Sequence, residues 1–91
     1  MSETSKILTT SNEAIIAIVD YTDYKYSPNS WHYRVYVRVS DDFVNKYKNS
    51  ERIINGKRHV IINGAGGFTS QALATQQALI TIGDTLAKKS N

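Results

Sequence analysis

The stretch that decides the fold is Trp31-His32-Tyr33-Arg34-Val35-Tyr36-Val37-Arg38-Val39, in which two kinds of side chain alternate. The odd positions hold tryptophan, tyrosine and three valines, and the even positions are His32, Arg34, Tyr36 and Arg38. Successive side chains of a strand point to opposite faces, so this alternation predicts a strand with one face in the core and one basic, aromatic face at the surface. The even positions are therefore the first candidate binding residues.

Predicted hairpins lie on both sides of this strand. Before it, a β-branched run over residues 14–19 predicts a strand buried on both faces, and Ser27-Pro28-Asn29-Ser30 predicts the turn that joins the two strands. After it, residues 52–54 and 57–62 flank Asn55-Gly56, the preferred pair for a two-residue type I′ turn.

Two helices are expected. Residues 40–48 have a capping serine, Ser40, and two aspartates at the positive end of the helix dipole. Residues 69–89 form the longer helix, with Thr69 as its cap. We expect this helix to face the sheet with the stripe Ala72, Gln76, Leu79, Gly83 and Leu86.

A glycine-rich segment, residues 63–69, comes between the last predicted strand and this helix. Backbone N–H groups in such a position can hold a phosphate. The segment lacks the full dinucleotide fingerprint and has no Gly-Lys-Ser/Thr, so a tight strand-to-helix turn is the preferred interpretation.

These elements predict an α+β fold with two layers. The expected layers are an antiparallel sheet of three or four strands and one long C-terminal helix packed on one face. Residues 1–12 are expected to be a polar N-terminal arm and residues 13–89 a single domain. The predicted core consists of Ile16, Ile18, Trp31, Val35, Val37, Val60, Ile62, Leu79, Ile82 and Leu86.

Composition excludes several kinds of site. The 91 residues include no cysteine, which rules out disulfides, thiolate zinc ligands and cysteine nucleophiles. No apolar run approaches the roughly 18 residues of a membrane span, and residues 1–12 are too polar for a signal peptide. We expect a cytoplasmic protein that does not bind a membrane.

Catalytic and metal-binding patterns are missing from the sequence as well. The two histidines, His32 and His59, have no carboxylates at a recognisable zinc-site spacing, and no serine lies in a nucleophile elbow. The aspartates lie beside predicted turns or a helix cap, where structural roles are usual. We therefore expect no enzyme activity, no cofactor and no metal.

Positive charge is concentrated in the middle of the chain. The protein has a net charge of +3, whereas residues 25–60 contain eight basic and three acidic residues, a net charge of +5. Six tyrosines and the tryptophan fall in much the same region, at positions 21–47. They suit three roles equally: a stacking platform for unpaired bases, anchors of a protein interface, or core and strand residues.

The order strand, turn, strand, strand, Gly-x-Gly, helix across residues 14–88 resembles the later part of a double-stranded RNA-binding domain. That resemblance implies a glycine-bearing turn before a final helix whose start carries phosphate-binding lysines. Here residues 64–74 contain no lysine, the leading helix of the family is replaced by a polar arm, and residues 40–57 are an insertion. In size and its Tyr/Asn/Lys-rich, cysteine-free composition, the chain is also similar to small accessory proteins of phages and mobile elements.

The function expected from these observations is that of a non-enzymatic binding module for nucleic acid or a nucleoprotein. The candidate binding residues are His32, Arg34, Tyr36, Arg38, Lys57 and Arg58. The alternative is a phage-type inhibitor or adaptor that binds and blocks a host protein complex. That alternative includes a homodimer formed through an exposed strand edge.

Overall fold

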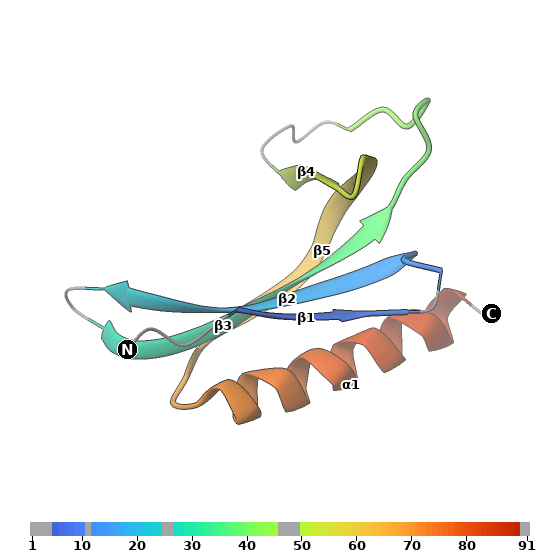
Figure 1. Ribbon diagram of the computed structural model, residues 1–91. Helices are drawn as coiled ribbons and strands as arrows, with labels where there is room; N and C mark the ends of the chain where they lie inside the picture. Colours follow the sequence, from blue (N-terminus) through green and yellow to red (C-terminus); the bar gives the residue numbers. More distant parts are fainter. Residues whose placement is uncertain (1–4, 11, 25–26, 46–49, 90–91) are drawn as a thin grey trace.

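The computed structural model describes residues 5–10, 12–24, 27–45 and 50–89 (Figure 1). Within these residues the chain forms five strands and one helix. Their bounds are β1 (Lys6–Thr9), β2 (Ile15–Tyr24), β3 (Ser27–Arg38), β4 (Glu51–Ile54), β5 (Lys57–Phe68) and α1 (Gln71–Lys89). The strands form one antiparallel sheet in the order β1-β2-β3-β5-β4, which puts β3 at its centre.

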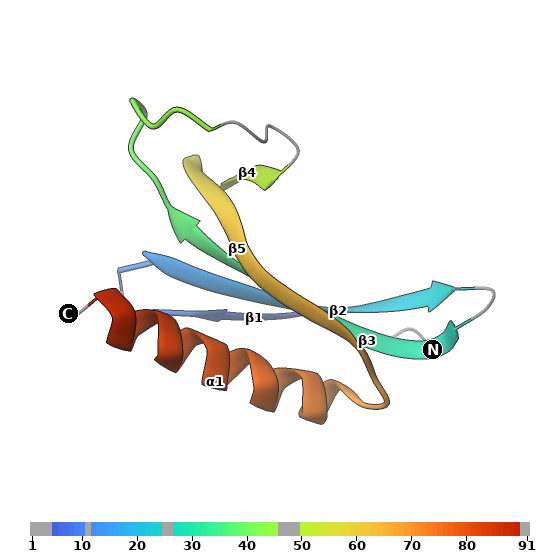
Figure 2. The ribbon, with the colours of Figure 1, turned by 180° about the vertical axis from the view of Figure 1, so that it is seen from behind.

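The predicted α+β class, the antiparallel sheet and the C-terminal helix packed against it are confirmed. The helix packs against one side of β2 and β3 and part of β5, and β4 lies at the end of the sheet farthest from it (Figures 1 and 2). The number of strands differs from the expected three or four. Residues 6–9, expected to belong to a polar arm, pair with β2 from Lys6↔Val19 to Thr9↔Ile16 and form an edge strand.

The first hairpin is present, but its turn is not where the sequence predicts it. Residues 27–30 already belong to β3, and residues 25–26, which join β2 to β3, lie outside the described residues. Pro28 falls at a shift of register, between the pairs Thr22↔Ser30 and Tyr24↔Ser27. Proline has no N–H to donate, and such irregular positions are where a sheet tolerates it.

The second hairpin is confirmed in detail. Strands β4 and β5 pair as Ile54↔Lys57, and the two residues between them have positive φ, 52° at Asn55 and 76° at Gly56. Positive φ at both central positions defines the type I′ turn that the sequence predicts.

The short helix expected over residues 40–48 is wrong for its described part. Residues 41–42 form a turn and residues 43–45 have no regular structure, while residues 46–48 lie outside the described residues. The guanidinium of Arg58 donates to the backbone carbonyls of Ser40, Asp41 and Phe43, at 3.0, 2.7 and 3.0 Å. The carbonyl of Ser40 also accepts the N–H of Phe43 at 3.1 Å, so the segment makes a single turn whose carbonyls point to Arg58, and the described residues do not continue it as a helix.

The glycine-rich segment is a strand instead of the expected loop. Strand β5 continues through residues 63–68, and the helix begins at Gln71. The cap is Ser70, because its Oγ accepts the N–H of Leu73 at 3.2 Å and its carbonyl accepts the N–H of Ala74. The predicted Thr69 cap is therefore one residue too early. The long β3 provides pairing partners as far as Trp31↔Phe68, which keeps this part of β5 extended.

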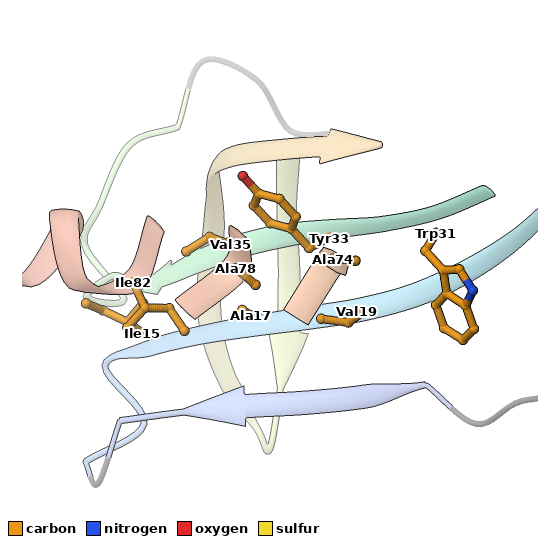
Figure 3. Packing of buried hydrophobic residues seen from close by; sticks show 9 residues of the cluster. All are labelled: Ile15, Ala17, Val19, Trp31, Tyr33, Val35, Ala74, Ala78 and Ile82. Carbon is orange, nitrogen blue, oxygen red and sulfur yellow. The ribbon is translucent and has the colours of Figure 1, made fainter. Parts of the chain in front are cut away.

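The core lies between the sheet and α1 (Figure 3). Of the ten predicted core residues, Trp31, Val35 and Ile82 belong to this cluster, and Val37 packs against it. Ile16 and Val60 are buried and Ile18 is half-buried, but all three lie outside the cluster, and Ile16 and Ile18 pair with Tyr36 and Arg34 on the other face of the sheet. Ile62, Leu79 and Leu86 are exposed, and for these three the prediction is wrong. Ile62 falls at a register shift, because Val35 pairs with Asn63 and Tyr36 with Ile61, and this removes Ile62 from the alternation.

The helix faces the sheet with another stripe than the predicted one. Its buried residues are Ala74, Thr75, Ala78, Thr81 and Ile82. Alanines allow the backbone of a helix to lie close to a sheet, and threonine hydroxyls can be buried when they bond to a carbonyl one turn earlier. Thr81 does so to Gln77 at 3.0 Å, and its hydroxyl also meets the hydroxyl of Tyr33 at 3.0 Å. No helix in the described part of the chain is long and apolar enough to cross a membrane.

Candidate binding face

The sheet face opposite α1, here called the open face, is defined by His32, Arg34, Tyr36 and Arg38 on β3 with their cross-strand neighbours. Odd-numbered residues Trp31, Tyr33 and Val35 belong to the core cluster, so the predicted separation of the two faces is confirmed. Across the sheet, Arg34 pairs with Ile18 and Gly64, and Tyr36 pairs with Ile16 and Ile61. One run of sequence therefore supplies the central row of the open face.

A hollow of about 470 Å³, here called the glycine groove, lies on the open face between β3 and β5. Its floor is the glycine-rich part of β5, and its walls include Arg34 and His32; the lining residues are Ser30, His32, Tyr33, Arg34, Ile61, Gly64, Ala65, Gly66 and Gly67. A Cβ added at Gly64 would lie 3.0 Å from the carbonyl oxygen of Tyr33, and one at Gly66 would lie 3.3 Å from Cβ of His32. Glycine therefore lets β5 lie close to β3 and leaves the groove floor without side chains.

A second hollow continues the groove towards β4. It is lined by Arg34, Tyr36, Ser50, Glu51, Arg52 and Ile61. Arg34 and Ile61 line both hollows, so the two hollows adjoin, and together they are here called the trough. Arg34 and Arg52 are both exposed at this trough.

Tyr36 is not an exposed platform. Its side chain is only 5% exposed, and Cζ of Arg52 lies 5.9 Å from the centroid of its ring. A guanidinium over a tyrosine ring is a cation–π contact, so the accessible planar group here is that of Arg52. Arg52 is absent from the candidates predicted from sequence. One signal in the sequence could have identified it. The Asn55-Gly56 turn sets the register of the hairpin, which pairs Arg52 with His59, and His59 pairs with Arg38 on its other side.

Arg38 and Lys57 meet at a third hollow near the end of β3. It is lined by Ala14, Arg38, Val39, Ser40, Asp41, Gly56, Lys57 and Arg58. Arg38 and Lys57 are exposed. The carboxylate-bearing Asp41 lines the same hollow, so the positive charge there has a neighbour of opposite sign. The structure thus divides the predicted binding residues between two places.

Arg58 has a structural role. It forms a salt bridge with Glu51, Nε to Oε1 at 2.5 Å and Nη2 to Oε2 at 3.2 Å, besides its three bonds to the carbonyls of residues 40–43. A guanidinium has five N–H donors, and these five bonds use all of them. The hydrogen bond to Glu51 raises the pKa of Arg58. All of its donors are occupied in holding residues 40–43 and Glu51 beside β5.

The charge near the glycine groove depends on His32 and Asp20, which pair across β2 and β3. Burial lowers the pKa of His32 below its ordinary value of 6.5, the charge of Arg34 lowers it further, and Asp20 opposes both effects. A hydrogen bond of 2.7 Å from the hydroxyl of Ser5 is the largest cause that lowers the pKa of Asp20. At neutral pH, His32 is therefore an uncharged imidazole beside the permanent cation Arg34.

The described aromatic residues mostly support the core. The Tyr21 and Trp31 rings meet edge to face at 5.2 Å between centroids, and the Tyr33 and Phe68 rings lie 5.9 Å apart. Among the three roles open to the tyrosines, the structure gives Trp31 and Tyr33 that of core residues. The side chains of Tyr24, Tyr26 and Tyr47 lie outside the described part.

Within the described ranges, no three His, Asp or Glu side chains gather in a way that could hold a metal ion. Comparison of the chain with protein-family models, with curated proteins and with solved structures finds no match.

Proposed function

We propose that the protein is a non-enzymatic binding module that takes single-stranded nucleic acid, free or within a nucleoprotein, along the open face. The observation that carries this proposal is the position of Arg34 in the trough. Arg34 is exposed, and it lines both the glycine groove and the second hollow, which Arg52 also lines. Exposed cations beside an accessible backbone floor suit phosphates and planar bases at the same time.

The shape of the trough favours an unpaired strand over a duplex. The glycine groove is about 470 Å³, within the range of pockets that hold small ligands and large enough for one nucleotide. A base can lie on the glycine floor or against the Arg52 guanidinium, whereas paired bases inside a duplex present no free face. With Tyr36 covered, arginine planes replace tyrosine rings as the stacking groups of this proposal.

The test is fluorescence anisotropy with short labelled single-stranded RNA, single-stranded DNA and their duplexes at two salt concentrations. Arg34→Ala combined with Arg52→Ala should weaken single-strand binding at least about tenfold and flatten the salt slope by about 0.7 per lost phosphate contact. The matched control is Lys6→Ala with Lys88→Ala, which removes the same charge from exposed positions away from the open face. That control should keep most of the affinity.

Two outcomes would overturn the proposal. One is no binding at low salt, where phosphate-driven affinity is greatest. The other is an equal loss of affinity in the two double variants, because general charge and not the open face would then explain binding. Melting curves by circular dichroism establish that each variant is folded.

A second candidate function is a protein-binding inhibitor or adaptor, and one observation favours it. Val44 and Ile53 are 86% and 62% exposed and line a hollow with Arg52 and Arg58, and Phe43 beside Val44 is 44% exposed. Exposed apolar residues beside an exposed arginine, here Arg52, are typical of protein interfaces. Binding through them would depend little on salt and would survive nuclease treatment of a host lysate. Val44→Ser with Ile53→Ser would abolish it.

A further inference from the structure

The tetrapeptide Ile-Ile-Asn-Gly occurs twice in this chain, at residues 53–56 and 61–64. Asparagine followed by glycine is the sequence most prone to spontaneous deamidation, because glycine has no side chain to hinder the attack of its backbone nitrogen on the asparagine side chain. The two asparagines, Asn55 and Asn63, are both exposed to water. Since the two copies have the same local sequence, a difference in their reactivity must come from the fold.

The first copy is held in a conformation that opposes the reaction. Asn55 and Gly56 are the central residues of the type I′ turn, with φ of 52° and 76°. In such a turn the first central residue has ψ of about +30°, which puts the next backbone nitrogen and the asparagine side chain on opposite sides of the Cα–C bond. Ring closure requires them on the same side. Asn55 can therefore react only after the turn opens and the pair Ile54↔Lys57 separates.

The second copy is extended, and its reacting groups are already in contact. Asn63 and Gly64 belong to β5, and the N–H of Gly64 donates to Oδ1 of Asn63 at 2.7 Å. This hydrogen bond places the attacking nitrogen beside the side-chain carbonyl whose carbon it must reach, which is the arrangement of a near-attack conformer. A smaller movement therefore closes the ring at Asn63 than at Asn55.

The backbone around Asn63 is also free to make this movement. Strand β4 pairs with β5 only over residues 57–60, so in the described part of the chain residues 61–68 are paired on one side only, with β3. A register shift between Ile61 and Asn63 interrupts this pairing just before the reacting residue. A segment that is paired on one side and lies next to an irregularity opens at a lower free energy than the middle of a sheet.

We propose that Asn63 deamidates spontaneously in the folded protein and that the type I′ turn protects Asn55. The backbone nitrogen of Gly64 gives its proton to solvent and bonds to Cγ of Asn63, and the side-chain nitrogen leaves as ammonia. Water then opens the ring: opening at the side-chain carbonyl gives aspartate, and opening at the main-chain carbonyl gives isoaspartate, whose main chain is one carbon longer. Both products add a negative charge at position 63, next to Gly64 of the glycine groove.

The test is peptide mapping of the folded protein after incubation in mildly alkaline buffer at physiological temperature. Trypsin cuts between the two sites, at the basic residues that separate them, and gives peptides of residues 53–57 and 59–88. Mass spectrometry of these peptides should show that Asn63 deamidates at least about tenfold faster than Asn55. In denaturing urea, where the turn and the strand are both lost, the two rates should approach each other.

Two variants are matched controls. Asn63→Asp should remove most of the early mass gain of the whole protein, because aspartate has no side-chain ammonia to lose, whereas Asn55→Asp, which keeps a favoured pair for the turn, should leave it nearly unchanged. Equal rates at the two sites in the folded protein, a faster reaction at Asn55, or no reaction at Asn63 would overturn the proposal. An equal preference for Asn63 in urea would also overturn it, because the sequence and not the fold would then be the cause. None of these results depends on nucleic-acid binding.

Discussion

Cζ of Arg52 lies 5.9 Å from the centroid of the Tyr36 ring, so a cation from the edge strand β4 covers an aromatic residue of the central strand β3. The Tyr36 side chain is therefore almost completely buried, whereas Arg52 remains exposed. The sequence of β3 predicts that Tyr36 is an exposed binding residue. In the structure Tyr36 is buried, and Arg52 is the accessible group at this place.

This relationship predicts different effects for the two residues. Tyr36→Ala should lower the free energy of unfolding by about 3 kcal/mol, because it removes a nearly buried aromatic side chain. Arg52→Ala should lower it by less than about 1 kcal/mol, the usual value of an exposed cation–π contact. Urea denaturation measures both changes. A Tyr36→Ala protein as stable as the unchanged chain would show that the ring is exposed in solution.

The two faces of β3 predict a ranking of stability. Trp31→Ala should cost about 3–5 kcal/mol through the cavity left by a side chain that is 4% exposed. Val37→Asp should unfold the domain, because it puts a charge beside the core cluster. Arg38→Ala, at an exposed position, should change the melting temperature little. The reverse ranking in circular dichroism melts would mean that the strand register is wrong by one residue.

The Asn55-Gly56 turn predicts a backbone effect. Gly56 has φ of 76°, a conformation that is strained for a β-branched residue. Gly56→Val should therefore cost more than about 1 kcal/mol of stability. Ile53→Val, at a 62% exposed position of the same hairpin, is the control and should be nearly neutral. Equal denaturation midpoints for the two variants would argue against a type I′ turn in solution.

Replacing glycine by alanine should change the stability of the protein in opposite directions at Gly64 and at Gly83. Gly64→Ala would bring a Cβ to 3.0 Å from the carbonyl oxygen of Tyr33, so it should destabilise the domain by about 1–2 kcal/mol and narrow the glycine groove. Gly83→Ala meets no atom within 4 Å on the exposed side of α1 and should stabilise the helix by about 1 kcal/mol. Thermal melts of dilute protein compare them. A stabilising Gly64→Ala would show that β3 and β5 are farther apart than described.

His32 and Asp20 predict the pH dependence. Both have a lowered pKa in the folded protein, so each contributes stability that is lost on acidification: His32 as the pH falls below 6.5, and Asp20 below 3.8. A polyanion in the glycine groove would favour the protonated imidazole, so binding should strengthen as the pH falls below 6.5. His32→Gln should remove that pH effect while keeping the salt dependence. Anisotropy titrations at pH 5.5 and 7.5 compare the two proteins, and identical pH profiles would contradict the role of His32.

Part of the candidate site could be predicted from sequence, because strand geometry fixes it locally. The alternation over residues 31–39 places Arg34 and Arg38 opposite the core in any sheet that buries Trp31. The same alternation could not show that Arg58 has all five donors occupied, since its partners lie at positions 40–51 and are brought together only by folding. Nor could it show Arg52 above Tyr36, because that contact crosses strand β5.

The sequence by itself determined the features whose causes lie within a few residues: the two faces of β3, the Asn55-Gly56 turn and the C-terminal helix. Tertiary structure alone decided which side of that helix meets the sheet. Hydrophobicity alone favours the side of Leu79. The side of Ala78 and Thr81 faces the sheet instead, because small side chains and a threonine hydroxyl bonded to a helix carbonyl allow the helix to pack closer to the sheet. Pairing across the sheet likewise decided that residues 6–9 and the glycine-rich residues 63–68 are strands. These segments have only a weak local preference for a strand, and hydrogen bonds from the neighbouring strand keep their backbone extended.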